Sequence, residues 1–250
     1  NRAWLSYLFK NKRWEDYRTA YKHQPVRNDL YSCRLQVARL NSGAKKQALK
    51  AAESLWLVPH SQHDACDPLF KVWNETGQPT SALALKRFWL AAEKGNTRLA
   101  RYIERSIKNK AHKAQAAVFW KVRKDPTTVA KLSKKQLTGK ARAITLTYAY
   151  KRWSLKDRVA ATHSWLKQRK TLGKAEQSYR ESLNRTLGLR LAANYDDKAA
   201  VLIAKLDPEY QIKDVTEWRI RVALSQQDWK EVSRTIGKLP PKEQENDRWV

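Results

Sequence analysis

The chain has 250 residues, which is long enough to bury a sizeable core, either in one or two compact domains or in a quasi-linear array of repeats. Only 7 glycines and 8 prolines, with few runs of β-branched residues, argue against strands as the main element, and no stretch reaches the roughly 18 apolar residues of a membrane span. The 51 lysines and arginines outnumber the 24 acidic residues, giving a formal net charge of +27, a surplus that bears on partners and not on fold.

The first 107 residues predict a succession of helices separated by short breaks. Aromatic residues at helical spacing between Trp4 and Tyr21 are interrupted by polar residues 11–13, so two short helices are expected there. Apolar residues then recur at intervals of three and four, and the runs end near glycine, asparagine or proline. The further helices expected in this part are 29–40, 44–58, 68–75, 85–92 and 99–107.

Helical spacing continues in the second half of the chain. Residues 116–122, 141–150 and 155–170 are expected to be helical, with Pro126 and Gly139 as breaks. Apolar residues at four-residue intervals predict a helix at 179–191, followed by a break at 194–196 and a helix at 199–206. Asp214, with Glu217 three residues later, resembles a capping box, and Asp228 is expected to begin a helix at 229–239.

Two units near the end of the chain repeat at an interval of 33 residues. The residue pairs that match at this offset are Ile203 and Ile236, Lys205 and Lys238, Leu206 and Leu239, and Pro208 and Pro241. A period in the thirties, filled by two short antiparallel helices, is typical of helical-hairpin solenoids, although no unit satisfies the tetratricopeptide pattern. We therefore predict an all-α fold, a right-handed superhelix of degenerate α-helical hairpins, as one domain over residues 1–250.

Residues 101–175 form a strongly basic segment, called the basic belt below. They hold 21 lysines and arginines and only three acidic residues. A basic groove with interleaved aromatic rings can hold an anionic polymer by charge and stacking, whereas a solvated face with three more core tryptophans would give the same pattern. The candidate contacts with such a polyanion are Lys121, Arg123, Lys124, Lys134, Lys135, Lys151, Arg152, Trp120, Trp153 and Trp165.

The two cysteines, Cys33 and Cys66, lie one repeat apart. Their spacing alone leaves two alternatives open, a disulfide in an oxidising compartment or a pair of buried free thiols. His60, His63 and Cys66 form an H-x2-H-x2-C pattern, but this is not a standard structural zinc spacing, and a polar loop between helices is the simpler interpretation. We expect no metal and no cofactor.

Catalytic motifs have weak support in this sequence. There is no Gly-rich phosphate loop or nucleophile elbow, and the Glu53-Ser54 and Glu181-Ser182 pairs lie within amphipathic helical patterns, where a solvated glutamate is the default. The chain begins at Asn1, ends at Val250 without an obvious cap and contains no methionine, so we expect a piece of a longer protein whose remainder holds the chemistry.

Several segments of the sequence resemble the soluble lytic murein transglycosylases of Gram-negative bacteria. The segments that carry the resemblance are ESLWL at 53–57, ACDPLFKVW at 65–73 with Gly77, AAEKGNT at 91–97, WRIRVAL at 218–224, and the short pieces 239–240, 242–243 and 247–249. Cys33 stands where that family has the upstream partner of its second cysteine. The resemblance covers most of the chain, and residues 105–175 match least.

This resemblance implies a fold, a location and a reaction. It implies the large N-terminal α-superhelix, which closes into a ring beside a lysozyme-like catalytic domain, a periplasmic location and a Cys33–Cys66 disulfide. The family reaction is non-hydrolytic cleavage of peptidoglycan to a 1,6-anhydro product, with one glutamate as general acid and base in a Glu-Ser motif followed by a Gly-Leu-Met-Gln motif. A chain without methionine lacks that second motif, so no catalytic residue is assigned here.

Two hypotheses of different classes follow. The first is a non-catalytic superhelical segment of a periplasmic lytic transglycosylase that shapes the ring around murein glycan strands, with the catalytic domain of the same polypeptide and peptidoglycan as partners. The second is a basic helical-repeat scaffold for nucleic acid or acidic proteins, for which binding would depend steeply on salt and the cysteines would be reduced.

Overall fold

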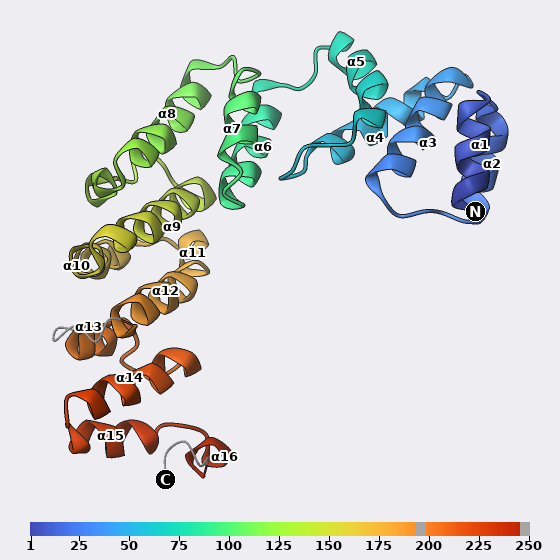
Figure 1. Ribbon diagram of the computed structural model, residues 1–250. Coiled ribbons are helices and arrows are strands. Elements are labelled where there is room, and N and C mark those ends of the chain that lie inside the picture. Colours follow the sequence, from blue (N-terminus) through green and yellow to red (C-terminus); the bar gives the residue numbers. More distant parts are fainter. Residues whose placement is uncertain (194–198, 246–250) are drawn as a thin grey trace. The chain divides into compact units, whose positions relative to one another are not determined.

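The computed structural model in Figure 1 describes residues 1–193 and 199–245, and within these ranges the regular elements are all helices. The helices are α1 Arg2–Lys10, α2 Trp14–His23, α3 Asp29–Asn41, α4 Lys45–Trp56, η1 Asp64–Cys66, α5 Asp67–Glu75, α6 Ser81–Glu93, α7 Thr97–Glu104, α8 Lys110–Lys124, η2 Pro126–Lys131, α9 Gly139–Lys156, α10 Arg158–Gln168, η3 Arg169–Thr171, α11 Lys174–Gln177, α12 Arg180–Ala192, α13 Ala199–Leu206, α14 Lys213–Ser225, α15 Trp229–Ile236 and α16 Pro241–Gln244. None of these described helices is both long and apolar enough to cross a membrane. The predicted all-α fold of degenerate helical hairpins is confirmed.

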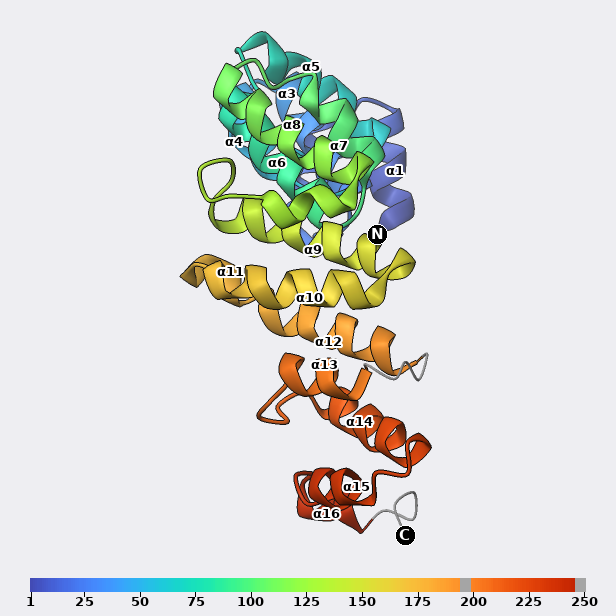
Figure 2. The ribbon, with the colours of Figure 1, turned by 90° about the vertical axis from the view of Figure 1, so that its left-hand side faces the viewer.

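The chain divides into two compact units, residues 1–116 and 117–250, called the N-terminal unit and the C-terminal unit below. In the N-terminal unit, α1 to α5 pack each on the next in the chain, and α6 packs on α7 as a further hairpin. In the C-terminal unit, α9 packs on α10, α12 on α13 and α14 on α15, and α12 also packs on α9 and on α14 (Figure 2). Both units are therefore built from helices that pack on the next helix along the chain and on helices one or two further along, as α12 does on α9 and α14.

Short polar residues begin many of these helices because their side chains satisfy backbone N–H groups that have no partner within the helix. Asn28 accepts from the Tyr31 amide, Asn96 from the Leu99 amide and Asp228 from the Glu231 amide. At the other end of a helix, Gly77 has a φ of +83°, a left-handed conformation that favours glycine. These local signals are visible in the sequence, and most of the predicted breaks are confirmed.

Three sequence predictions differ from the structure. The predicted helix at 155–170 is divided, because the Asp157 carboxylate accepts the Ala160 amide at 2.9 Å and starts α10 there. The predicted capping box at Asp214 is wrong: α14 begins earlier, after Ile212, and the Asp214 carboxylate pairs with Arg185. Gly139 is the first residue of α9, not a break outside a helix. The predicted break at 194–196 and the resemblance at 247–249 lie outside the described residues.

The interior of each unit is mostly apolar and aromatic. In the N-terminal unit, Leu5, Leu8 and Tyr17 are fully buried, with Tyr31 packed against them. In the C-terminal unit, Leu183, Leu187 and Leu191 form a buried stripe along α12. Tyr179, which shares their four-residue spacing, precedes α12 and is half-buried. The stripe thus faces the core, as its spacing predicts.

Candidate functional site

The candidate cations of the basic belt lie on three segments of the C-terminal unit. Lys121, Arg123 and Lys124 occupy the last turn of α8, and Lys134 and Lys135 lie in the connection between η2 and α9. Lys151 and Arg152 lie on α9. All of these side chains are exposed except Lys151, which is half-buried. They can therefore reach an anionic partner without a change in the fold.

The three tryptophans of the belt differ in exposure. Trp120 is half-buried, and the Arg123 guanidinium carbon lies 5.9 Å from the centre of its ring. Trp153 is half-buried and stacks on Tyr150 with ring centres 6.0 Å apart. Trp120 and Trp153 thus present part of a ring to solvent within the charged surface, as stacking on a ligand requires.

Trp165 does not belong to this surface. Its side chain is 1% exposed, its ring meets that of Tyr150 edge to face at 5.3 Å, and its Nε1 donates a 2.7 Å hydrogen bond to Asn184 Oδ1. A ligand has no access to this indole, because α10 packs its inward face against α9, α12 and α13. Trp165 is therefore corrected from a candidate contact to a core residue.

Two of the belt cations are also structural. Arg142 is 1% exposed and its Nη1 donates to Glu176 Oε2 at 2.9 Å. Arg169 donates to the carbonyl oxygens of Leu206 and Lys205 at 3.1 and 2.6 Å, and burial lowers its pKa. The positive charge available for a partner is therefore smaller than the composition of residues 101–175 suggests.

A shallow groove of about 320 Å³ lies beside the last turn of α8 and is lined by Lys121, Lys131 and Asp125, among others. Asp125 caps η2, since its Oδ1 accepts from the Thr127 hydroxyl at 2.7 Å and from the Thr127 amide at 3.0 Å. The hydrogen bond from the Thr127 hydroxyl lowers the pKa of Asp125 most, and the bond from the Thr127 amide lowers it further. This carboxylate is therefore charged at neutral pH. The lining of the groove therefore carries one negative charge, on Asp125, and two positive charges, on Lys121 and Lys131.

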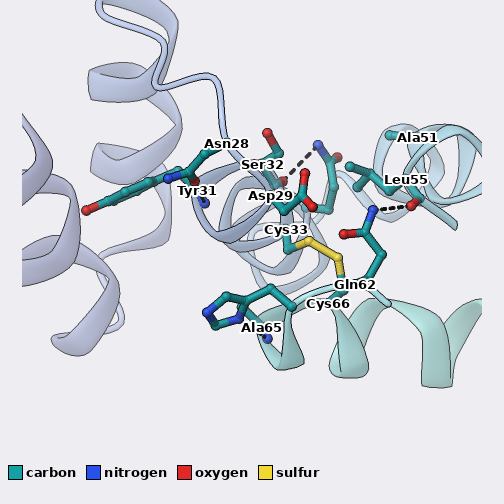
Figure 3. The surroundings of a disulfide bond; sticks show 12 residues. Asn28, Asp29, Tyr31, Ser32, Cys33, Ala51, Leu55, Gln62, Ala65 and Cys66 are labelled. Atoms are coloured by element: carbon teal, nitrogen blue, oxygen red, sulfur yellow. Dashed lines mark hydrogen bonds between the residues drawn. A yellow bond between two sulfur atoms is a disulfide. The ribbon is translucent and has the colours of Figure 1, made fainter. Parts of the chain in front are cut away.

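Cys33 and Cys66 form a disulfide, and both are fully buried (Figure 3). Their Cα atoms are 4.8 Å apart, and the bond joins α3 to the end of η1. Gln62 lies beside Cys66, and its Nε2 donates to the Leu55 carbonyl (Figure 3). The disulfide thereby fixes the connection between α4 and α5 against α3, and the alternative of two free thiols is excluded.

The residues of the H-x2-H-x2-C pattern have structural contacts. Cys66 is not available as a thiolate, since it is bonded to Cys33. His63 Nδ1 accepts the Ala65 amide at 3.0 Å and caps η1, and His60 Nδ1 lies 3.9 Å from Asp29 Oδ2. Within the described residues, no three histidine, cysteine, aspartate or glutamate side chains are grouped so as to hold a metal ion.

A second groove, of about 620 Å³, lies in the N-terminal unit between α5, α6 and α7 and was missed by the sequence analysis. Arg87 lines this groove, although it is only 4% exposed. The signal for it is present in the sequence: Arg87 lies three residues after Ala84 and four before Ala91, both fully buried, so it falls on the apolar stripe of α6. A charged residue at such a position is either paired or functional.

The fold and the disulfide define the class of the protein: an all-helical protein of stacked, irregular hairpins, with a strongly basic segment. No protein-family model matches the chain. The chain is 27% identical over 221 residues to the soluble lytic murein transglycosylase of Escherichia coli K12 and 26% identical over 220 residues to that of Salmonella typhimurium. Each alignment covers 87% of this chain, and the chain spans about a third (34%) of the length of these relatives.

Solved structures agree with these relatives. An inactive variant of the lytic transglycosylase Slt from Pseudomonas aeruginosa matches 99% of this chain with a TM-score of 0.65 at 28% identity, and the match covers 40% of that protein. The 70 kDa soluble lytic transglycosylase Slt70 of E. coli matches 98% of the chain with a TM-score of 0.70 at 24% identity, over 39% of its own length. The homologues of this chain are therefore soluble lytic murein transglycosylases, and their α-superhelical fold is the fold of this chain.

Proposed function

We propose that this chain is a non-catalytic α-superhelical segment of a peptidoglycan lytic transglycosylase. In this account it forms part of a ring that guides murein glycan strands to a separate lysozyme-like domain of the same polypeptide. The observation that carries the proposal is that the relatives align with 87% of the chain, whereas the chain spans only 34% of them. The buried disulfide is in keeping with an oxidising compartment, and we propose a periplasmic location.

The basic belt supplies the contact with the substrate in this proposal. Peptidoglycan stems carry carboxylates, and exposed lysines and arginines attract such groups through charge and charge-assisted hydrogen bonds. The side chains proposed for this role are Lys121, Arg123, Lys124, Lys134, Lys135, Lys151, Arg152, Trp120 and Trp153. Trp165 is left out because it is buried.

Retention of the purified chain on intact sacculi, measured by co-sedimentation, tests this contact. We expect retention at about 0.15 M salt that decreases as salt is raised, because exposed charges are screened beyond a Debye length of about 8 Å. A basic helical protein of equal net charge serves as the control. Retention of the control without retention of this chain would rule out the proposed contact.

The rival function, a scaffold for nucleic acid, is favoured only by the net charge of +27. It predicts that added RNA displaces the chain from sacculi. It also predicts that the affinity for RNA falls steeply as salt is raised, because binding releases counterions from the RNA. If RNA binds more tightly than sacculi at the same salt, the rival is preferred. For the enzyme assignment, a reading frame without a lysozyme-like domain would contradict the proposal.

A further inference from the structure

We propose that the groove between α5, α6 and α7 of the N-terminal unit binds a carboxylate group of a small, partly apolar ligand. Arg87 forms the base of this site, with Arg98, Lys71 and Tyr102 at its rim. The groove has a volume of about 620 Å³, which is in the range of small-molecule sites. All of its lining residues belong to the N-terminal unit, whereas the candidate contacts of the basic belt all belong to the C-terminal unit.

The central observation is the environment of Arg87. Its Nε donates to the Val58 carbonyl at 3.2 Å, its Nη2 donates to the His60 carbonyl at 3.0 Å, and its guanidinium carbon lies 4.5 Å from the centre of the Trp56 ring. In the described part of the chain, no carboxylate forms an ion pair with it, and no acceptor is bonded to Nη1. Arg87 is thus a buried cation with neutral partners and one uncommitted nitrogen.

Burying an arginine in this way is unfavourable unless an anion compensates for the lost hydration. Removing a charge from water costs several kcal/mol, and carbonyl oxygens and an aromatic ring replace only part of that solvation. Burial lowers the pKa of Arg87 to about 10, so the group remains charged at neutral pH while its charge is disfavoured. A ligand carboxylate that reaches Nη1 would supply the missing partner, and the planar fork of arginine suits such a group.

The remainder of the groove fits an anion with amide and apolar parts. Arg98 and Lys71 are exposed cations, whereas Asp67 is the one acidic residue among those that line the groove, so the net charge of the lining favours an anionic ligand. Tyr102 is 65% exposed and offers a ring and a hydroxyl, and Asn74 offers an amide. Inorganic phosphate has neither an amide nor an apolar part to contact this lining, so it should be a poorer ligand than such a carboxylate.

A purely structural role for Arg87 is the competing explanation. Its two hydrogen bonds hold residues 58 and 60 of the connection between α4 and α5, and such a clamp needs no ligand. It does not, however, account for an open groove at the same guanidinium with Arg98 and Lys71 at its edge. The two explanations differ in whether a carboxylate binds and whether rim residues matter.

Calorimetric titration of the full chain with matched probe pairs distinguishes them. The first pair is acetyl-D-alanyl-D-alanine and its C-terminal amide, and the second is N-acetylmuramic acid and N-acetylglucosamine. We expect the acid of at least one pair to bind about tenfold or more tightly than its neutral counterpart, because only the acid pairs with Arg87. Binding of the first acid alone identifies a peptide terminus as the source of the carboxylate, and binding of the second alone identifies a sugar acid.

Variants assign the effect to the groove. Arg98→Gln should weaken binding of the acid about three- to tenfold, and Tyr102→Ala should also weaken it, whereas Lys86→Gln on the exposed side of α6 should leave it unchanged. Arg87→Gln should abolish it, with circular dichroism to check the fold. Equal affinity for acid and amide, tighter binding of inorganic phosphate, no binding of any probe, or equal effects of Arg98→Gln and Lys86→Gln would overturn the proposal.

The choice of these probes rests on the proposed function, whereas the site itself does not. If the carboxylate site fails, sacculus retention through the belt is unaffected, because the two sets of residues lie in different units. If the belt fails, the probes still report on Arg87. The two failures are therefore distinguishable.

Discussion

Arg142 on α9 and Glu176 on α11 form a buried ion pair, with Nη1 and Oε2 2.9 Å apart and side chains 1% and 3% exposed. Arg142 Nη2 also donates to the Thr171 hydroxyl at 2.8 Å, and the Gly173 amide donates to the same Glu176 oxygen at 2.5 Å. The pair fixes the connection between α10 and α12 against α9. Arg142, one of the many cations of the basic belt, thus has a structural role: it holds α11 against α9.

Removing one member of this pair should be much worse than removing both. Glu176→Gln leaves the Arg142 charge buried without its partner, so we expect the free energy of unfolding to fall by about 3–5 kcal/mol. The double variant Arg142→Met, Glu176→Leu should recover most of that loss, because neither charge is then buried. Urea unfolding of Arg142→Met, Glu176→Leu and the double variant gives the coupling energy, and additive effects would contradict the assignment.

The Cys33–Cys66 disulfide should stabilise the N-terminal unit. It closes a loop of 33 residues, for which loop entropy predicts a contribution of about 3–4 kcal/mol. Reduction should therefore lower the midpoint of denaturation of the wild-type chain. The Cys33→Ala, Cys66→Ala variant is the control: it should be less stable than oxidised wild type and insensitive to reductant. Equal midpoints of oxidised and reduced wild type would show that the bond adds no stability.

Gly188 allows α12 to approach α14 closely. A Cβ built at this position would lie 3.1 Å from both methyl carbons of Val215, closer than ordinary van der Waals contact. Alanine improves helix propensity by up to about 1 kcal/mol, whereas overpacking costs about 1–3 kcal/mol, so we expect Gly188→Ala to destabilise the chain. A double-mutant cycle with Val215→Ala measures the clash. If Gly188→Ala proves stabilising, the approach of the two helices is looser than described.

Burial of Tyr150 should make the free energy of unfolding decrease at alkaline pH. Burial raises the pKa of Tyr150 to about 12, although its hydrogen bond with Ser164 and the charge of Arg142 act the other way. The unfolded pKa is about 10, so this contribution is fully present below pH 10 and is lost as the pH rises towards 12. Between pH 9.5 and 11.5 wild type should lose about 2 kcal/mol more than Tyr150→Phe. Parallel pH profiles of the two proteins would contradict the assignment.

Local signals in the sequence predicted most of the fold. Asn28, Asn96 and Asp228 mark helix starts because a short polar side chain can accept an amide three residues later, whatever the tertiary context. Asp157 also accepts an amide three residues later, but it lies within a continuous apolar pattern. The pattern therefore predicted one helix where the chain starts a new one. At Asp214 the sequence matches a capping box, but the carboxylate pairs with Arg185 instead. Because Arg185 is distant in the sequence, no local pattern predicts this contact.

The candidate site was less accessible to sequence reasoning. Composition could not separate Arg142, whose charge is buried, from Arg152, which is exposed, because both lie in the same basic run on α9. Trp165 and Trp153 likewise differ only in what packs against them. Arg87 had a signal in its place on the apolar stripe of α6, but its neutral partners depend on how residues 58 and 60 fold back. Burial decides each of these roles.

The most direct test of the proposed function compares two variants in the sacculus assay at about 0.15 M salt. The belt variant replaces exposed cations of the C-terminal unit by glutamine, at Lys121, Arg123, Lys124, Lys134, Lys135 and Arg152. The control variant removes the same number of lysines and arginines from the exposed surface of the N-terminal unit, at Arg2, Lys10, Lys22, Arg27, Lys45 and Lys46. We expect the belt variant to lose at least tenfold in retention while the control variant stays within about twofold of wild type. Equal losses in both variants, or none in the belt variant, would contradict it.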